Sequence, residues 1–524
     1  MNERGYKIVL TAPATEMSDH YKKIFVGFGA CISDPPFPRW FVKLLFYPPV
    51  SHHKGRVDYA PYAIRKIEAN LLENGFSEDD LIMVHPNHLN KVVGPETKIV
   101  GITVMDPLGL GPTSLTFSSF LHGDSATYIE FKNLMKTECF KKYNPKIVVG
   151  GMGAWQLYAV KDAQEKYGLS TVVIGEGEKI VPELFEKSVN GEDSPKVIFA
   201  EEPVTEQVPV IRNPSVGGLV EISRGCGRNC QFCVPTLRRK WDSPIEKIVK
   251  EIKVNLEGKC PSICLHAEDA LIYGSGPSDR FRPNRDKVVE LFTKVTQATN
   301  GLPIAIGVSH VSPAPIAADP TLVSSISEIL QIGKVDHARL FGYQIGIETG
   351  SVRLIKKFMA GKPLPYKPEE WPDVVELAFG ISKDFKWVPA ATLIMGLPGE
   401  TVDDVNASLE LMDRLKDCPS FIVPQFFMPI TDTIMENQKT FDTKNMFPEH
   451  WQLLNKCTDH SVRWADHLRT LYFAPESPFL RFGFWLGYRL LYMFAFFGGR
   501  KASKKYGYKK ILDSLPKTSK PKSD

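Results

Sequence analysis

Three cysteines in the middle of the chain have the spacing of ligands for an iron–sulfur cluster. Cys226, Cys230 and Cys233 stand in the segment Cys-Gly-Arg-Asn-Cys-Gln-Phe-Cys. Thiolates at positions i, i+4 and i+7 of a loop can bind three corners of a cubane cluster and leave its fourth iron open to a substrate atom. A structural zinc site would need four ligands, usually in Cys-x-x-Cys pairs. A zinc loop and three unrelated thiols remain the alternatives.

The cysteine segment resembles that of the radical S-adenosylmethionine (SAM) enzymes. It directly follows a predicted strand, residues 219–223, and Phe232 before the third cysteine matches the usual pattern of that family. The resemblance implies a [4Fe–4S] cluster held by the three cysteines, with the amino and carboxylate groups of SAM bound to the open iron. One electron from the cluster would cleave SAM to methionine and a 5′-deoxyadenosyl radical.

Two later segments are similar to parts of the same family that approach SAM. Residues 346–351, Gly-Ile-Glu-Thr-Gly-Ser, resemble its fourth-strand segment, and residues 396–401, Gly-Leu-Pro-Gly-Glu-Thr, resemble its fifth-strand turn. Residues 266–269 and 309–310 end the second and third predicted strands at the same end. The resemblance covers about residues 217–430 and leaves the catalytic side chains unknown. The residues that it assigns to SAM are Glu348, Ser309, Gly396 and Pro398.

Glycines near the ends of two earlier strands resemble a cobalamin-binding domain that precedes the radical SAM barrel in one subfamily. Glycines at strand ends let the backbone approach a flat macrocycle closely. An ordinary Rossmann-like domain that binds a nucleotide or nothing is the alternative. The residues assigned to cobalamin are Asp106, Leu108, Gly150, Gly151, Gly153, Gly175, Glu176 and Gly177.

The signature that supplies a lower histidine ligand to cobalt in classical cobalamin proteins is missing. No Asp-x-His-x-x-Gly occurs in the sequence. The resemblance therefore implies a base-off cobalamin without a histidine on cobalt. The segment 105–114, after a strand that ends at Val104, is the candidate for the loop under the corrin.

The elements that must position these residues form two α/β series. Residues 98–104, 146–151 and 171–175 are apolar β-branched runs ending near glycine, which predicts parallel strands in a doubly wound sheet with its ligand at the carboxyl ends. A second series begins at residue 219, and its strand candidates recur about every 40 residues, as in a barrel or partial barrel.

The fold class predicted from these patterns is α/β, with three parts. A Rossmann-like cobalamin-binding domain is expected over residues 1–200, and a radical SAM partial (β/α)6 barrel over residues 217–430. A mainly helical C-terminal region with a basic tail is expected over residues 431–524. Residues 197–217, which are rich in proline and have no clear period, are predicted to be a linker.

Composition excludes several classes of protein. The 524 residues are 43% hydrophobic and 24% charged, which is ordinary for a globular chain. A net charge of +4 provides no overall basic field, so no nucleic-acid partner is expected. Nine cysteines are too sparse in a chain of this length for a disulfide scaffold, and with no secretory signal they predict a reducing cytoplasm.

The C-terminus combines an apolar segment with most of the positive charge. Residues 482–497 hold thirteen apolar or aromatic residues in sixteen, and residues 498–524 carry nine Lys and Arg against two Asp. The apolar segment is too short to span a bilayer. We expect it to form a wall of the substrate chamber; an interfacial helix with the basic tail on anionic lipid is the alternative.

The function predicted is that of a cobalamin-dependent radical SAM C-methyltransferase acting on an unactivated carbon. The sequence is similar in general character to archaeal enzymes that C-methylate a glutamine of methyl-coenzyme M reductase, a post-translational modification. A lipid-modifying enzyme, such as one that forms archaeal tetraether rings, and a non-catalytic cobalamin or iron–sulfur carrier are the alternatives. The partners implied are a protein or lipid substrate and an electron donor such as ferredoxin or flavodoxin.

Overall fold

The computed structural model describes residues 4–22, 24–33, 38–121 and 123–472, with the isolated positions 478, 482–483 and 485–486. Its first part is built on a six-stranded parallel sheet with the order β4-β1-β5-β6-β7-β8. The strands are β1 (Ile8–Thr11), β4 (Leu81–Met83), β5 (Ile99–Thr103), β6 (Lys146–Gly150), β7 (Thr171–Ile174) and β8 (Val197–Phe199).

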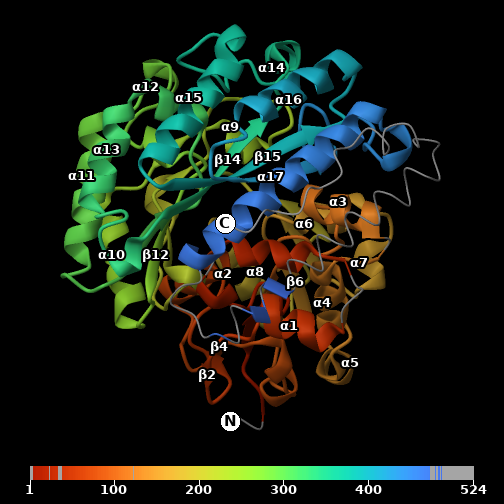
Figure 1. The fold of residues 1–524 in the computed structure, drawn as a ribbon. Helices are drawn as coiled ribbons and strands as arrows, with labels where there is room; N and C mark the ends of the chain where they lie inside the picture. The colour runs from red at the N-terminus through yellow and green to blue at the C-terminus, as the bar shows by residue number, and fades with distance from the viewer. Residues whose placement is uncertain are drawn as a thin grey trace.

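Helices cover both faces of this sheet (Figure 1). Neighbouring side chains of a strand point to opposite faces, so Ile8 and Leu10 join one apolar core and Val9 joins the other. The first core is closed by α2 (Tyr62–Glu73) and α8 (Val181–Val189). The second is closed by α4 (Ala126–Met135), α5 (Glu138–Tyr143), α6 (Ala154–Ala159) and α7 (Ala163–Lys166). This is the doubly wound arrangement that the sequence predicts.

The second part is a partial barrel of six parallel strands. One half pairs β9, β12 and β13, and the other pairs β14, β15 and β16. The halves meet after β13, where the N–H of Gln344 donates to the carbonyl of Ser309 (2.8 Å). The strands are β9 (Leu219–Glu221), β12 (Ser262–His266), β13 (Ala305–Val308), β14 (Phe341–Glu348), β15 (Trp387–Met395) and β16 (Phe421–Phe426).

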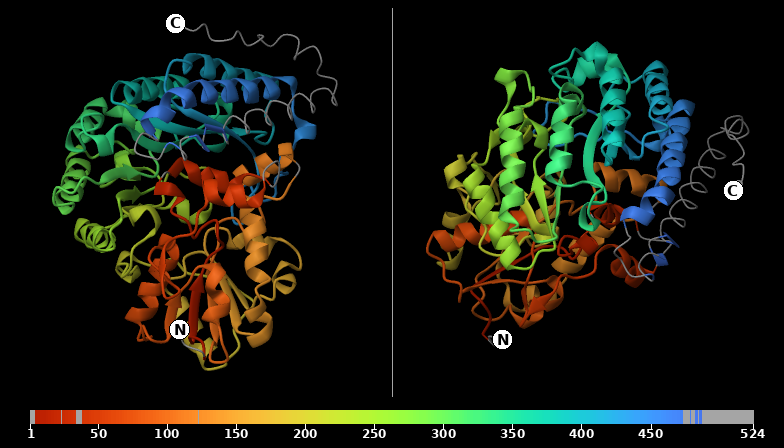
Figure 2. Two further views of the ribbon diagram at one scale, coloured as in Figure 1. Left: turned by 60° about the horizontal axis from the view of Figure 1, so that its bottom comes forward. Right: turned by 60° about the vertical axis from the view of Figure 1, so that its left-hand side comes forward.

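Helices line the outside of the barrel (Figures 1 and 2). Each follows a strand, as parallel pairing requires, and buries apolar residues against it. They are α10 (Ile245–Glu257), α11 (Arg285–Ala298), α12 (Pro313–Ala318), α13 (Pro320–Ile329), α14 (Val352–Phe358), α15 (Trp371–Asp384) and α16 (Val402–Arg414).

A long helix, α17 (Pro448–Tyr472), lies beside β16, the last strand of the barrel. The amide N–H of Ile422 donates to the Ser461 hydroxyl (2.9 Å), and Ser420 contacts His460 (2.8 Å). This helix agrees with the helical C-terminal region that the sequence predicts. Residues 427–447 before it contain one short 3-10 turn and no α-helix.

Three strands of the N-terminal sheet and the barrel were not predicted from the sequence, nor were the two-residue strands β2 (His52–His53), β3 (Arg56–Val57) and β11 (Trp241–Asp242). β4 and β8 have only three residues each, and β8 lies inside the segment 197–217 that was predicted to be a linker. Both are edge strands, so they pair on one side only and need no long apolar run. β16 was not located either, because Pro424 interrupts it; this edge strand tolerates a proline.

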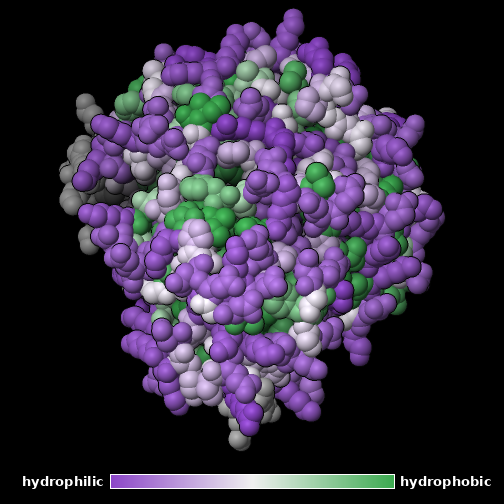
Figure 3. All heavy atoms as spheres, turned by 180° about the vertical axis from the view of Figure 1, so that it is seen from behind, coloured by the Kyte–Doolittle hydropathy of each residue, from purple (hydrophilic) through white to green (hydrophobic). Residues whose placement is uncertain are grey.

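Most of the apolar segment 482–497, and all of the basic tail, lie outside the described residues. Within the described part, every helix falls short of the length and hydrophobicity needed to cross a membrane. The face seen in Figure 3 is mainly hydrophilic, with apolar atoms exposed in separate patches.

The two parts of the molecule share buried polar contacts along α2. Lys66 forms an ion pair with Glu251 of α10, and both side chains are almost fully buried. Tyr62 donates a hydrogen bond to the same carboxylate (2.6 Å), and so does the N–H of Ile211 (3.2 Å). Because a buried charge is costly without a partner, these contacts fix how α2 sits on the barrel.

Replacing Lys66 alone should destabilise the protein strongly. Lys66→Met leaves the Glu251 carboxylate buried without its cation, which costs about 3–5 kcal/mol. The double variant Lys66→Met with Glu251→Met should recover most of the melting temperature measured by calorimetry. Lys187→Met, which breaks an exposed pair with Glu183, is the control and should change little. A single variant that melts like the wild type would contradict the interpretation.

Candidate functional site

The three cysteines lie on one loop at the mouth of the barrel. The loop follows β10 (Ser223–Arg224) and ends at α9 (Pro235–Arg238). Its backbone has positive φ at Gly225, Gly227 and Asn229. A Cβ at Gly225 would overlap the carbonyl of Arg239, so glycine is required there. We call residues Cys226–Cys233 the cysteine loop.

The three thiols face one another. Cys230 and Cys233 are hydrogen-bonded through their side chains, and Cys226 lies close enough for its charge to affect both. Burial raises the pKa of Cys226 to about 11. Iron binding would therefore have to displace protons from this group.

This donor set fits a multinuclear cluster better than a single metal ion. Among the described residues, no three His, Cys, Asp or Glu side chains converge on one ion position. In a cubane, each thiolate binds a different iron, so the three sulfurs need not share a centre. The cysteine loop can therefore hold a [4Fe–4S] cluster and presents no preformed zinc site.

Arg228, inside the cysteine loop, anchors it to the barrel. Its guanidinium pairs with Asp269 after β12 (2.8 Å), and both side chains are buried. It also donates to the carbonyl of Leu364 (2.8 Å) and lies over the Phe281 ring, 4.7 Å from its centroid. The sequence analysis did not single out Arg228. Its position between two ligand cysteines was the only available signal.

Glu348, assigned to SAM from the sequence, lies at a distortion of β14. Its φ is 65°, and the register of the pairing with β15 shifts between Gly346 and Glu348. Its carboxylate accepts hydrogen bonds from Lys362 (2.9 Å) and Thr392 (3.3 Å). The Trp371 indole N–H contacts the carbonyls on either side of the distortion. Unusual backbone held this firmly is typical of functional sites.

Lys362 connects Glu348 to the cysteine loop. Its ammonium group lies close enough to Cys230 and Cys233 for the charges to interact. Burial alone would lower the pKa of Lys362, but the charges of Glu348 and Cys230 outweigh it and raise that pKa. A cation is therefore retained beside the thiols. No sequence motif pointed to this residue.

The turn with Gly396 and Pro398 follows β15 at the same barrel mouth. Gly396 has a φ of 82°, and a Cβ there would overlap the Phe441 ring. Its N–H donates to Glu400 (2.6 Å), and Pro398 accepts from Lys357 through its carbonyl (3.4 Å). The turn is thus held by side chains from two other segments.

His450, at the start of α17, supports this turn. Its Nδ1 accepts from the N–H of Phe447 (2.9 Å), so Nε2 carries the proton and donates to Glu400 (2.7 Å). His450 and Glu400 are both buried. The sequence gave no sign of this contact, because it joins residues fifty positions apart.

The hydroxyl group of Ser309 already has three hydrogen-bonding partners within the protein. It donates to the carbonyl of Ala267 (2.9 Å), accepts from the N–H of Ala267 (3.1 Å), and contacts Nδ1 of His266 (3.0 Å). Any contact of Ser309 with SAM would therefore use its backbone or its methylene group.

The residues assigned to cobalamin lie at the carboxyl ends of β5, β6 and β7. Asp106 accepts from the N–H of Gly111 (2.8 Å) and from Gln156 (2.7 Å), and Gln156 accepts from the N–H of Leu108 (2.8 Å). Asp106 and Leu108 therefore shape the loop after β5. Gln156, on α6, was not recognised from the sequence.

The glycines after β6 serve packing of the protein on itself. A Cβ at Gly151 would lie 2.6 Å from Thr103 Oγ1, and one at Gly153 would overlap the carbonyl of Met105. Gly150 has no such close contact. Met105 and Met152 instead project outward, with 65% and 67% of their surface exposed. Packing within the protein therefore requires glycine at positions 151 and 153, and the assignment of Gly151 and Gly153 to cobalamin stays a prediction.

Glu16, in the segment after β1, adds a carboxyl group to this edge. It accepts from the N–H of Met105 (2.8 Å). Burial, with the nearby charge of Asp106, raises the pKa of Glu16 to about 8 although the backbone bond lowers it. The Glu16 carboxyl is therefore largely protonated at neutral pH.

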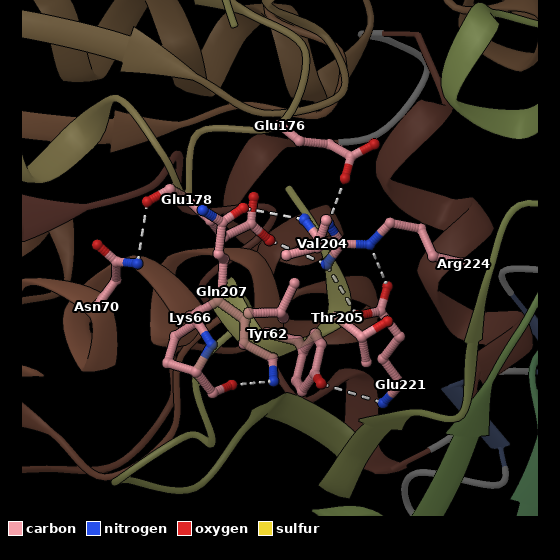
Figure 4. A network of polar contacts seen from close by, with 12 residues as sticks. Tyr62, Lys66, Asn70, Glu176, Glu178, Val204, Thr205, Gln207, Glu221 and Arg224 are labelled. Carbon is pink, nitrogen blue, oxygen red and sulfur yellow. Dashed lines mark hydrogen bonds and ion pairs between the residues drawn. The ribbon is translucent and has the colours of Figure 1, made fainter. Parts of the chain in front are cut away.

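The segment Gly175–Glu178 forms ion pairs with residues of the barrel. Glu176 pairs with Arg224 and Arg239, and Glu178 pairs with Arg224 (2.9 Å). Figure 4 shows Arg224 reaching Glu221 of β9 as well, at 2.8 Å. We call Arg224 with Glu176, Glu178 and Glu221 the interdomain clamp. Arg224 lies two positions before Cys226, so the clamp ties the cysteine loop to the N-terminal sheet.

The interdomain clamp lowers the pKa of Glu221. Burial alone would raise the pKa of Glu221, but the hydrogen bonds and charge of Arg224 outweigh it and hold that pKa below its ordinary value. Because the pKa of Glu221 is lower in the folded than in the unfolded protein, the clamp stabilises the folded protein fully above the ordinary glutamate pKa. It is lost as the pH falls through the folded-state value.

Breaking the interdomain clamp should loosen both loops that it joins. Arg224→Gln leaves the mostly buried carboxylates of Glu178 and Glu221 without this cation, while Glu176 keeps Arg239, so we expect a loss of about 3–5 kcal/mol. Hydrogen exchange should rise in residues 175–180 and 225–240, and Arg224→Lys should not restore protection because lysine lacks the fork geometry. The difference in melting temperature from the wild type should shrink below about pH 4. Arg339→Gln, at an exposed pair, is the control. Unchanged exchange in both loops would contradict this prediction.

Comparison with known proteins bears on the barrel. Residues 220–412 match the family model described as the Radical SAM superfamily. The tRNA-2-methylthio-N(6)-dimethylallyladenosine synthase of Sulfurihydrogenibium sp. is 24% identical over 286 residues, 53% of this chain and 59% of that protein. A probable threonylcarbamoyladenosine tRNA methylthiotransferase of Methanocaldococcus jannaschii is 25% identical over 44% of this chain and 49% of its own length. The chain thus spans about three fifths, or less, of these relatives.

Solved structures match over a larger part of the chain. The radical SAM methyltransferase TsrM from Kitasatospora setae, with cobalamin and a [4Fe–4S] cluster bound, aligns with a TM-score of 0.55 and 16% identity. The alignment covers 82% of this chain and 77% of TsrM. TsrM with tryptophan and a SAM analogue bound aligns similarly, with a TM-score of 0.54 and 17% identity. From the family match and the cysteine loop together, the chain contains a radical SAM domain, with the [4Fe–4S] cluster and SAM that such a domain implies, within a fold shared with TsrM.

Proposed function

We propose that this protein is a cobalamin-dependent radical SAM C-methyltransferase acting on a carbon without an activating group. The observation that carries the proposal is that the ligand-binding edge of the N-terminal sheet faces the mouth of the barrel. The interdomain clamp joins the two edges at one side. At the other side, α3 (Pro112–Leu121) holds β16: Thr116 accepts from the N–H of Phe426 (2.8 Å).

The N-terminal edge has features that suit cobalamin. Met105 and Met152 offer exposed apolar surface at adjacent strand ends, where open parallel sheets bind ligands. The loops after β5, β6 and β7, residues 104–111, 151–153 and 175–180, contain no histidine. The residues present therefore support cobalamin held without a histidine on cobalt.

The chain positions its cofactors and the cofactors supply the difficult chemistry. The cluster and SAM supply a 5′-deoxyadenosyl radical, and cobalamin supplies a methyl group that a carbon radical can take. Arg228 and Lys362 keep the cysteine loop in place at the mouth. Phe441 and His450 cover the turn after β15 and shield that side from water.

The proposed substrate rests on the general resemblance of the sequence to archaeal protein-methylating enzymes. A glutamine in methyl-coenzyme M reductase, or another protein site in an archaeal host, remains the first candidate, and an archaeal lipid is the alternative. The protein would act in the cytoplasm with a ferredoxin or flavodoxin as electron donor. A carrier without activity would need none of the distortion at Glu348.

A second candidate is methylthio transfer to tRNA, which the names of the curated relatives favour. That reaction needs a sulfur donor in addition to SAM. Mass analysis of the product separates the candidates, since methylation adds one CH₂ and methylthiolation adds sulfur as well.

Each cysteine of the loop should be required for SAM cleavage. Replacing Cys226, Cys230 or Cys233 by alanine leaves two protein ligands, so the reconstituted protein should lose iron and form no 5′-deoxyadenosine. Iron content and anaerobic 5′-deoxyadenosine formation measure this. Cys418→Ala, at a half-buried cysteine away from the mouth, is the control. A triple-alanine variant that still forms 5′-deoxyadenosine would overturn the radical SAM assignment.

The protein should retain cobalamin in a base-off form. The purified chain incubated with cobalamin should give absorption and EPR spectra of cobalt without a nitrogen ligand, because residues 104–111, 151–153 and 175–180 contain no histidine. Spectra of a nitrogen-ligated cobalt, or failure to retain cobalamin, would refute this part of the proposal.

A further inference from the structure

Helix α1 (Arg39–Phe46) exposes large apolar side chains on the N-terminal part of the molecule. Trp40 and Leu44 are 66% and 46% exposed. They stand four positions apart, so they lie next to each other on one face of the helix. Single exposed apolar residues are common on protein surfaces, but a tryptophan and a leucine on one helix face form a patch. We call Trp40 and Leu44 the α1 patch.

The inner side of α1 is fixed to the protein. Leu45 is buried with Val26 of the 3-10 helix η2 (Ile24–Cys31) in a small apolar cluster. Lys43 forms an ion pair with Glu130 of α4 (2.9 Å), whose side chain is almost fully buried. Because contacts of both kinds hold α1 in place, the helix cannot turn to bury the α1 patch against the protein.

The apolar segment near the C-terminus begins beside α1. A Cβ added at Gly483 would lie 3.4 Å from a methyl group of Leu45, so the two segments lie side by side. Phe482 is 57% exposed, and its ring centroid lies 5.7 Å from that of Trp485. These positions are the start of the apolar run 482–497. The start of this run therefore adds exposed aromatic surface beside α1.

Both sequence segments that meet here are basic. Residues 35–57, which contain α1, hold four Lys and Arg and no Asp or Glu. Residues 498–524, which follow the apolar run, hold nine Lys and Arg against two Asp. Tryptophan, phenylalanine and leucine beside lysine and arginine are the composition of helices that bind the interface of a lipid bilayer. The positive charge favours a bilayer that carries anionic headgroups.

We propose that α1 and the segment that starts at residue 482 form a surface that docks this protein on an anionic lipid bilayer. Trp40, Leu44 and Phe482 would enter the headgroup region, with the basic tail on the lipid phosphates. One hydrophobic anchor alone binds a membrane marginally, and a polybasic segment adds the second signal that stable binding needs. The docking is peripheral, since α1 has eight residues and a bilayer span needs about 20. It is independent of the reaction that the protein catalyses.

The alternative occupant of this surface is a second copy of the chain. A symmetric dimer through α1 would bring two strongly basic tails together, and the repulsion between like charges would oppose it. An anionic bilayer instead attracts each Lys and Arg near its surface. Charge complementarity therefore favours the bilayer.

Vesicle cosedimentation with the full chain tests the proposal. The probes are vesicles of phosphatidylcholine alone and vesicles of phosphatidylcholine and phosphatidylglycerol in equal parts. We expect binding to the anionic vesicles at physiological salt and much weaker binding in 1 M salt, where the Debye length falls from about 8 Å to about 3 Å. Failure to bind the anionic vesicles at physiological salt would overturn the proposal.

Variants separate α1 from the tail. Trp40→Ala with Leu44→Ala should lower the vesicle partition constant at least about tenfold, because two apolar side chains no longer leave water. Its melting temperature and its preference for anionic lipid should stay unchanged. Deleting residues 498–524 should weaken binding at least about tenfold and remove most of the salt dependence. Leu377→Ala, at an exposed leucine of α15, is the control. A double variant that partitions like the wild type would overturn the role of α1.

Two further measurements report on the α1 patch directly. Lipids brominated in the upper part of the acyl chain should quench tryptophan fluorescence, and Trp40→Phe should reduce this quenching while vesicle binding persists. Equal quenching in both proteins would place Trp40 outside the bilayer and overturn the proposal. Sedimentation velocity without lipid should show no dimer that depends on the α1 patch. A dimer that Trp40→Ala abolishes would assign the surface to a second copy and overturn the proposal as well.

Discussion

The guanidinium group of Arg224 is the contact on which the arrangement of the two ligand-binding edges depends. It binds Glu221 of its own barrel and Glu176 and Glu178 of the N-terminal sheet. Only a planar fork with several donors can satisfy three carboxylates at once. Because Cys226 follows two residues later, the same side chain links the cysteine loop to the N-terminal sheet.

The barrel mouth concentrates backbone that would be unfavourable elsewhere. Glu348 adopts positive φ, and Gly225 and Gly396 adopt positive φ against close neighbours. Each is supported from outside its own segment, by Trp371, Arg239 or Phe441. A distorted backbone persists only when its surroundings determine it, and here those surroundings are the barrel and the segment before α17.

The two facing edges differ in polarity. The N-terminal edge exposes Met105 and Met152, whereas the barrel mouth carries ion pairs such as Lys362 with Glu348 and Arg228 with Asp269. An apolar edge suits the apolar surface of a ligand, and charged side chains suit its polar groups. The shared fold with TsrM and the radical SAM domain match are in keeping with this division.

The sequence by itself determined the α/β class, most of the strands, the cysteine loop and the barrel-mouth position of Glu348 and Gly396. Apolar runs and short motifs are local in the sequence, so they can be recognised before the fold is known. Only the tertiary structure decided that Glu176 binds Arg224, that Gly151 and Gly153 serve packing, and that His450 supports Glu400. Such contacts join residues far apart in the chain, and hydrogen-bond saturation can be counted only when every partner is in place.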